Sequence, residues 1–309
     1  MSEEERNRLL GIKPNLERRA KIFDLTRKFF KDQGFIEVET PIRVPAVAPE
    51  LEIEPFSSDG QFLATSPELY MKRLLAAGYD KIFQLSHCFR KGEQGRHHNS
   101  EFILLEWYRS GADYLRMIAD TEKLVMSVAI GLDMTPVIHY KNQAIDITPP
   151  WPRQTVKEAF LQFAGWDPVA EFEPVRFDLD LVTGVIPYMG LNHPTVLVDY
   201  PAALSSLARL KSDDPTVAER TEVFIGGLEL ANAYSELIDI AEQKSRFLEE
   251  TRRIAREKKR TAPMPAKFLE SLPYLPECGG IALGMDRLVM LFCDADSLDE
   301  VMAFTADTV

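Results

Sequence analysis

The sequence predicts an α+β fold in which an antiparallel β-sheet is flanked by helices. Runs with the alternating apolar and polar residues of β-strands come in pairs joined by polar or glycine-containing turns, a pattern typical of hairpins. Segments with helical periodicity separate these pairs, whereas parallel α/β folds alternate single strands with helices. Neither G-x-G-x-x-G nor G-x-x-x-x-G-K-S/T occurs, so dinucleotide-binding and P-loop folds are disfavoured.

Composition and charge limit the class of protein. The 309 residues are 45% hydrophobic and 27% charged, which suits one globular domain spanning 1–309. The net charge of -12 argues against nucleic acid held by a broad basic surface. Residues 1–10 are polar and no apolar run reaches the length of a membrane span, so we expect a cytoplasmic protein without membrane contact. Its 3 widely spaced cysteines predict reduced thiols.

The N-terminal third is predicted to hold a helix, a strand and a second helix. Apolar residues recur at helical spacing over 15–33, and the pattern stops at Gly34. Residues 35–41 alternate apolar and polar side chains and end in proline, as expected for a strand that leaves its sheet. Ser66 as N-cap and the proline after it predict a helix over 67–77.

A long hairpin is predicted over 81–90 and 101–109, around a polar loop at 91–100. Because side chains alternate between the faces of a strand, one face of this hairpin carries polar and aromatic residues together, which is typical of a binding surface. These residues are Gln84, Ser86, Cys88 and Arg90 on the first strand and Phe102, Leu104, Glu106 and Tyr108 on the second.

The C-terminal half alternates helices with strands. The Gly226-Gly227 pair predicts a two-residue hairpin turn within 221–236. The stretch 165–193 gives no clear pattern. Helices are expected over 114–130, 155–163, 242–260 (strongly charged, with a solvated face) and 286–292, and strands over 194–200 and 279–283.

Three segments together resemble the signature motifs of class II aminoacyl-tRNA synthetases. They are residues 34–41, the Phe89-Arg90 strand end with its loop into Glu101-Phe102, and residues 280–287 (Gly-Ile-Ala-Leu-Gly-Met-Asp-Arg). Each is weak singly, but their order and their strand, hairpin and strand-to-helix settings agree with the family. Residues 66–74, 98–102 and 229–237 look like its lysyl branch. The resemblance implies a class II catalytic fold that activates lysine or a lysine isomer as an adenylate with ATP.

Adenylate formation brings a carboxylate to the α-phosphate of ATP, so cations are required where negative charge builds up. In the resemblance, Arg90 matches the arginine that grips the α-phosphate, and Arg287 matches the arginine of the third motif that holds the ATP tail. A cation in the first turn of a helix faces the positive end of the helix dipole, which disfavours Arg287 as a plain surface residue. Both arginines are therefore predicted to be catalytic.

Two glutamates flank the Gly226-Gly227 turn. A regular two-residue loop places Glu222 and Glu229 on one face as diagonal neighbours, about 7 Å apart at the backbone. Two solvent-facing glutamates on a hairpin would be the plain interpretation. The family match instead implies that the pair carries Mg²⁺ bound to ATP, and oxygen ligands suit such a hard cation.

The remaining predicted site residues follow from the lysyl-branch resemblance. Phe102 matches the aromatic ring under adenine, although spacing alone equally favours a core residue, and His98 and Asn99 match residues around the nucleotide. A buried substrate ammonium requires carboxylates around it. The residues that match this pocket are Glu68, Glu236, Tyr108, Glu106 and Asn232.

Within the lysyl branch, the chain resembles free-standing ligases that attach (R)-β-lysine to a lysine side chain of elongation factor P. The first catalytic helix begins near residue 15, so no anticodon-binding domain is expected ahead of it. Ala282 stands where synthetases more often have glycine, and its methyl group would influence the choice between α- and β-amino acids. The helix over 16–33 with its strand is the usual dimer element of the class, so a homodimer is expected and tRNA is not an expected partner.

The sequence departs from the family pattern at two positions, and two alternative functions stay open. The glutamate after the motif arginine is displaced by one position, because Gly92 precedes Glu93, and Tyr234 replaces a common glycine. The alternatives are a truncated lysyl-tRNA synthetase-like enzyme that acts on tRNA or another carrier, and a non-catalytic paralogue that binds lysine-like molecules.

Overall fold

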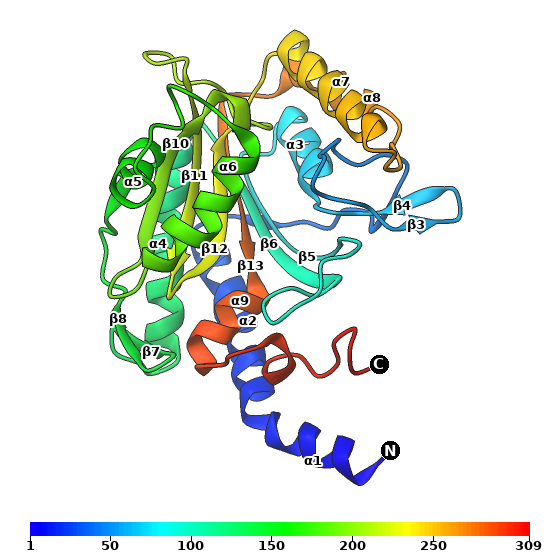
Figure 1. The fold of residues 1–309 in the computed structure, drawn as a ribbon. Helices are drawn as coiled ribbons and strands as arrows, with labels where there is room; N and C mark the ends of the chain where they lie inside the picture. Colours follow the sequence, from blue (N-terminus) through cyan, green and yellow to red (C-terminus); the bar gives the residue numbers. More distant parts are fainter.

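An eight-stranded sheet organises the protein, and the computed structural model describes all residues from 1 to 309 (Figure 1). Its inner neighbours pair antiparallel, as predicted, while each edge strand pairs parallel with its neighbour. In spatial order the strands are β1 (Ile36–Glu37), β5 (Lys81–Phe89), β6 (Glu101–Ser110), β13 (Cys278–Gly284), β12 (Leu228–Ser235), β11 (Val217–Ile225), β10 (Thr195–Pro201) and β9 (Arg153–Thr155).

One face of the sheet is sealed by three helices, α2 (Lys13–Asp32), α4 (Tyr114–Gly131) and α9 (Met285–Cys293). Inward-facing residues of the strands, such as Trp107 and Leu283, join these helices in a cluster of 38 buried residues. Because successive side chains alternate along a strand, the intervening residues of β6, β12 and β13 point to the opposite face. The core therefore holds one face rigid and leaves the other available for a site.

The opposite face is only partly covered. Helices α3 (Glu68–Ala76), α7 (Ile240–Arg256) and α8 (Ala266–Leu269) stand together beside the β5–β6 hairpin (Figure 1). Toward the far edge, α5 (Val156–Phe163) and α6 (Pro174–Asp180) pack through a second cluster that includes Phe160 and Phe224. The uncovered centre between these two groups of helices is where a ligand has access.

Smaller elements complete the chain. A three-stranded sheet comprises β2 (Arg43–Val44), β4 (Gln61–Leu63) and β3 (Ser57–Ser58), and a hairpin comprises β7 (Val137–Tyr140) and β8 (Gln143–Asp146). Both termini lie at one end of the molecule beside α1 (Glu3–Gly11), where Arg8 donates a hydrogen bond to the carbonyl of Ala303 (Figure 1). No helix combines the length and the apolar character needed to cross a membrane.

Most predicted elements are confirmed, but several differ from the expectation. The strand expected over 35–41 shrinks to two residues, and the helix expected from 67 begins one residue later, although Ser66 Oγ accepts a hydrogen bond from Glu68 N. Helix α1 was not expected because it buries none of its residues. The charged helix buries a stripe of Gln243, Phe247 and Ile254, so only its remaining surface is solvated.

Candidate active site

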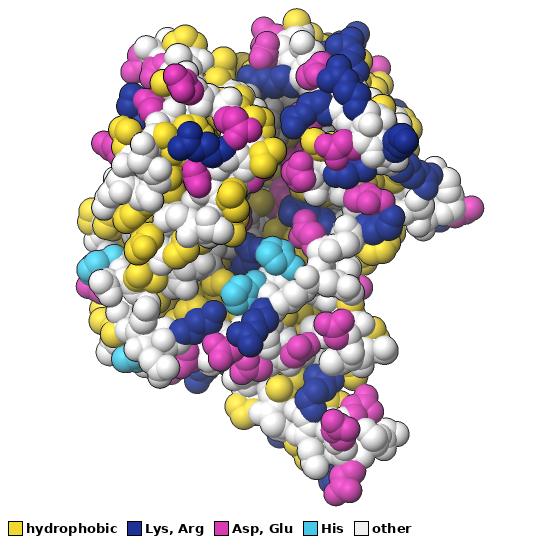
Figure 2. All heavy atoms as spheres, in the orientation of Figure 1, with side chains coloured by type: hydrophobic (Ala, Val, Ile, Leu, Met, Phe, Trp, Pro, Cys, Tyr) yellow, Lys and Arg dark blue, Asp and Glu magenta, His cyan; other side chains and the backbone are white.

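A cavity of about 510 Å³ opens on the uncovered face of the sheet. Figure 2 shows this hollow, with acidic and basic side chains on its walls and histidines at its margin. The structure brings together in it every residue that the sequence analysis named for a site. These residues are Glu68, Arg90, His98, Asn99, Phe102, Glu106, Tyr108, Glu222, Glu229, Asn232, Glu236, Ala282 and Arg287.

Arg90 lies at the end of β5 with its guanidinium over the ring of Phe102, 5.1 Å from the ring centroid. Phe102 pairs with Cys88 in the hairpin, so it projects from the cavity face and is not a core residue. A planar cation beside an exposed aromatic face offers one group for a phosphate and another for a stacked base. The arrangement fits the nucleotide role predicted for both residues.

The displaced glutamate of the loop also reaches the cavity. Gly92 adopts a positive φ of 83°, a conformation that glycine accommodates without strain. The turn brings Glu93 back toward Arg90, with 3.6 Å between Glu93 Oε1 and Arg90 Nη1. The glycine insertion therefore changes the path of the loop without removing a carboxylate from this wall.

Arg287 lies in the first turn of α9 and is held in place by three neighbours. It donates hydrogen bonds to the carbonyls of Glu229 (2.6 Å) and His97 (3.4 Å), and its Nη2 lies 2.8 Å from His98 Nε2. Burial, together with the charge of Arg287, lowers the pKa of His98, so its ring is suited to accept this bond in the neutral form. The guanidinium is thus oriented before any anion arrives.

Glu222 and Glu229 both line the cavity, but the regular ladder predicted for them is wrong. Beyond the Phe224–Glu229 pair the register shifts at a β-bulge, so Glu222 lies opposite Asn232 and the two glutamates are not simple diagonal neighbours. Burial and the charge of Glu229 raise the pKa of Glu222, which shows that the two carboxylates interact. Turn chemistry marks the hairpin in a sequence, whereas a bulge of this kind carries no such mark.

The residues present fit a magnesium ion shared with phosphates. Nowhere in the structure do three or more His, Cys, Asp or Glu side chains come together in a way that could hold a metal ion. Mg²⁺ is commonly held by one or two carboxylates while water and phosphate oxygens complete its shell. Glu222 pairs with Arg220 at 2.8 Å and Glu229 with Arg287 at 3.6 Å, so a cation bound by the two carboxylates would compete with these arginines.

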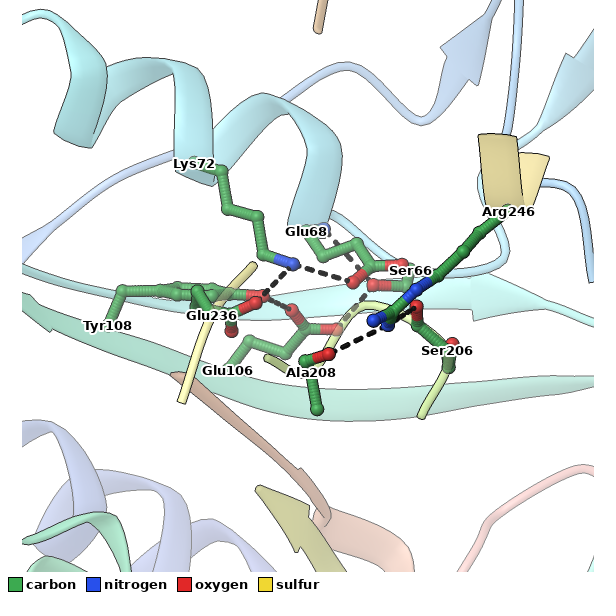
Figure 3. Close-up of polar contacts among 9 residues, drawn as sticks. All are labelled: Ser66, Glu68, Lys72, Glu106, Tyr108, Ser206, Ala208, Glu236 and Arg246. Atoms are coloured by element: carbon green, nitrogen blue, oxygen red, sulfur yellow. Dashed lines mark hydrogen bonds and ion pairs between the residues drawn. The ribbon is translucent and has the colours of Figure 1, made fainter. Parts of the chain in front are cut away.

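The other end of the cavity is acidic (Figure 3). Glu106 accepts hydrogen bonds from Ser66 Oγ at 2.6 Å and from the Tyr108 hydroxyl at 3.0 Å. Burial, with the charge of Glu68 added to it, raises the pKa of Glu106 to about 8. A buried carboxylate with neutral donors only is a favourable place for a ligand cation.

Glu68 and Glu236 complete this acidic end, and between them lies a residue to which the sequence analysis gave no role. Lys72 Nζ is 2.6 Å from Glu236 Oε2 and 3.3 Å from Glu68 Oε2 (Figure 3). Helical spacing from Glu68 could have indicated the second contact, since residues four apart share a helix face. The contact with Glu236, which is distant in sequence, had no such signal.

Ala282 lies at the centre of the cavity floor. On β13 it is directly opposite Glu106 of β6 on one side and Asn232 of β12 on the other. Directly opposed residues share a sheet face with their β-carbons about 5 Å apart. The methyl group of Ala282 therefore stands between two predicted substrate-binding side chains.

Asn99 is placed differently from the prediction that it surrounds a nucleotide. It lines the cavity, but its side chain donates to the carbonyl of Glu101 at 2.6 Å and accepts from the amide of Ala306 at 3.0 Å. Both halves of its amide are thus used to tie the hairpin to the C-terminal segment. Its observed contacts are structural.

A segment at 205–208 forms part of the cavity rim and is held by α7. Arg246 donates to the carbonyls of Ser206 at 2.9 Å and Ala208 at 2.7 Å (Figure 3). Ser206, which lines the cavity, has a positive φ of 47°, an uncommon conformation for a residue with a side chain. These two hydrogen bonds from one guanidinium nitrogen stabilise the turn, and sequence patterns gave no indication of them.

The geometry as a whole defines a class. One end of the cavity holds Arg90 and Arg287 with the carboxylates that pair with them, and the other end holds the acidic cluster around Glu106, on a sheet whose strands carry the three motifs. The model of the family described as tRNA synthetases class II (D, K and N) matches residues 7–308. The chain belongs to this family of class II synthetases.

Curated relatives narrow the comparison further. The chain is 40% identical, over 313 aligned positions, to proteins named elongation factor P–(R)-β-lysine ligase from Salmonella gallinarum and from Salmonella paratyphi A. A protein of the same name from Salmonella choleraesuis is also 40% identical. In each case the alignment covers 95% of this chain and 95% of the relative.

Proposed function

We propose that this protein is an ATP-dependent ligase that activates (R)-β-lysine, or lysine, as an aminoacyl-adenylate and transfers it to a lysine side chain of elongation factor P. One observation carries the proposal: a single cavity holds Arg90 and Arg287 at one end, which we assign to the phosphates of ATP, and a cluster of carboxyl groups at the other, which we assign to the ammonium groups of the substrate. A diamino acid placed between these ends would direct its carboxylate to the α-phosphate. The names and coverage of the curated relatives support the same reaction and acceptor.

In the first step the amino-acid carboxylate attacks the α-phosphorus of ATP, an O–P bond forms and pyrophosphate leaves. Arg90 binds the α-phosphate oxygens as negative charge grows on them, and Phe102 stacks beneath the base. Arg287 binds the departing phosphates. Glu222 and Glu229 would hold Mg²⁺, which neutralises phosphate charge when bound.

In the second step a neutral ε-amine of the acceptor lysine attacks the adenylate carbonyl. An amide forms, AMP leaves with the bonding electrons, and the amine releases a proton. The reaction requires no nucleophile from the enzyme, because the mixed anhydride is already activated. Since the acceptor is a translation factor, we place the reaction in the cytoplasm.

The decisive experiment combines the purified protein with ATP, (R)-β-lysine and elongation factor P. Intact-mass spectrometry is expected to show one added β-lysyl group on the acceptor. No mass gain under conditions that support ATP–pyrophosphate exchange would remove the acceptor from the proposal. Charging of tRNA with lysine in a parallel reaction would favour the synthetase-like alternative. Absence of any exchange would favour the non-catalytic paralogue. That alternative was suggested by the displacement of Glu93 in the sequence, but Glu93 lines the cavity in the structure.

We further propose a homodimer formed at the β1 edge. Ile36 on β1 is 53% exposed and the neighbouring Tyr79 is 40% exposed, which leaves apolar surface beside an unpaired strand edge. A second copy of the chain would cover both. Light scattering is expected to give twice the chain mass of 35.1 kDa, and a monomeric mass would contradict the proposal.

A further inference from the structure

Lys72 is a charged residue beside the cavity that the proposed reaction leaves without a role. It projects from α3 into the acidic end, and its side chain is only 2% exposed (Figure 3). Its two partners, Glu236 and Glu68, are 1% and 12% exposed. Lys72 is the only residue with which Glu236 forms an ion pair.

Burying a lysine and a glutamate together is costly, and apolar residues of similar volume often serve stability equally well. Burial lowers the pKa of Lys72, but the charges of Glu236 and Glu68 outweigh it and raise the pKa above its ordinary value. Lys72 is therefore an ammonium at neutral pH. The presence of Lys72 at this site calls for a reason other than stability.

The charges at the acidic end provide a reason for the presence of Lys72. Three carboxyl groups, those of Glu68, Glu106 and Glu236, meet the single ammonium group of Lys72 in a desolvated space, and burial raises the pKa of Glu106 to about 8. A diamino acid brings two ammonium groups. Without Lys72, two carboxylates close to one another would share a proton, so one of them would no longer be an anion that attracts a substrate ammonium.

We propose that Lys72 is a positioning residue for the amino-acid substrate. Its ammonium favours the ionised form of Glu236 and fixes the position of that carboxylate, so that Glu236 and Glu68 accept the ammonium groups of a diamino acid. This inference rests on the proposed function, and Lys72 itself does not touch the reacting atoms.

Several other groups that titrate surround the pair, and one of them is Glu50, which lines the cavity from the segment between β2 and β3 and interacts with Lys72 and Glu68. Glu106 and Tyr108 face it from β6, and Cys278 faces it from β13. Helix α8 contributes the ring of Phe268, 6.0 Å from Lys72 Nζ, and α7 contributes Arg246, which the backbone carbonyls at the rim already occupy. Lys72 is thus the cation that sets the charge state of Glu236.

The test measures ATP–pyrophosphate exchange with Lys72→Met, Lys72→Arg and, as a matched control, Arg73→Met. Arg73 is the next residue on α3 and contacts the ring of Tyr70 instead of the carboxylates. Lys72→Met is expected to raise the KM for the amino acid about tenfold or more while the KM for ATP stays unchanged. The defect is expected to shrink as pH rises and Glu236 ionises, and Lys72→Arg is expected to restore much of the binding.

A purely structural ion pair would behave differently. It would lower kcat and affect both KM values alike at every pH, and that result would overturn the proposal, as would an unchanged KM. If Lys72→Met does not fold, Glu236→Gln gives a second reading, because its amino-acid KM is expected to rise without recovery at high pH. A recovery there would count against Lys72 acting through Glu236.

The outcomes also separate this inference from the function on which it rests. Exchange by the unaltered protein with an unchanged amino-acid KM in Lys72→Met would overturn the role of Lys72 alone. No exchange with either lysine isomer by the unaltered protein would overturn both.

Discussion

Gly280 lies so close to Glu236 that a β-carbon at this position would overlap a carboxylate oxygen and the ring of Tyr108. Gly280 pairs with Tyr108 on one side and Tyr234 on the other, in the strand that crosses the floor of the cavity. The absence of a side chain is what allows the carboxylate and the phenol to meet above the strand. A glycine therefore shapes part of the pocket that we propose for the substrate ammonium groups.

Replacing Gly280 with alanine tests this relationship. The added methyl is expected to displace Glu236, to raise the KM for the amino acid about tenfold and to lower the free energy of unfolding by about 1–3 kcal/mol. Exchange kinetics and urea unfolding measure the two effects. Gly184→Ala is the control, because its β-carbon would approach only a carbonyl oxygen, at 3.7 Å. An unaltered KM in Gly280→Ala would show that the pocket accommodates the methyl group without displacing Glu236.

Ala282 is expected to influence substrate choice, because its methyl stands between Glu106 and Asn232. Ala282→Gly opens space beside the substrate backbone and is expected to shift kcat/KM toward α-lysine relative to (R)-β-lysine by about 10-fold, the lower end of the range for a single methylene contact. Parallel exchange assays with both isomers give the ratio. Ala233→Gly removes the same group from the core face and is expected to reduce stability while leaving the ratio unchanged. A constant ratio in Ala282→Gly would exclude this role.

Local signals were enough to predict the elements that carry the site. Alternation over the β5–β6 hairpin put Arg90, Phe102 and Glu106 on one face, and the register confirms this arrangement. The glycine pair likewise marked the β11–β12 hairpin, whose turn pairs Phe224 with Glu229 as expected. Both features depend on residues close in sequence, so they are readable without the fold.

Features that depend on contacts between distant segments were missed. A β-bulge between Val223 and Phe224 changed the expected relation of Glu222 to Glu229, and nothing in the local sequence marks it. The ion pair between Lys72 and Glu236 joins α3 to the end of β12, and only the folded chain brings these two segments together. Asn99, expected near a nucleotide, is held by the C-terminal segment at Ala306. Residue type and spacing predicted which side chains gather, but not how they pair.

The two glutamates of the β11–β12 hairpin are expected to govern the magnesium requirement. Glu222→Gln and Glu229→Gln each remove one anionic oxygen ligand, so the Mg²⁺ concentration for half-maximal exchange is expected to rise about tenfold or more, as for the loss of a group that supports a metal. Titration of exchange with Mg²⁺ at saturating amino acid measures this. Glu219→Gln on the same strand breaks an ion pair with Arg209 outside the cavity and is expected to leave the requirement unchanged. Equal effects in all three variants would argue against a metal role.

Substrate affinity is expected to depend on pH through the acidic end. Burial, with the charge of Glu68 added, raises the pKa of Glu106 to about 8, and burial against the opposing charge of Lys72 leaves the pKa of Glu236 at about 7. Protonated carboxyls bind ammonium groups weakly, so the KM for the amino acid is expected to fall as pH rises from 6 to about 8.5, while the substrate amines stay largely charged. Exchange kinetics across this range with a constant KM would contradict the assignment of these carboxylates.

The same groups predict the pH dependence of stability in the ligand-free protein. A carboxyl whose pKa is raised above its ordinary value of 4.5 binds its proton more tightly in the folded state, so its contribution to stability is complete below about pH 4.5. That contribution is lost as pH rises through the folded-state value of about 8 for Glu106. Urea unfolding from pH 5 to 8.5 is therefore expected to show declining stability, and Glu106→Gln, which cannot ionise, is expected to decline less. An identical slope of stability against pH in the variant would mean that Glu106 does not carry the effect. A bound diamino acid, whose ammonium groups favour the ionised carboxylates, is expected to flatten this slope in the unaltered protein.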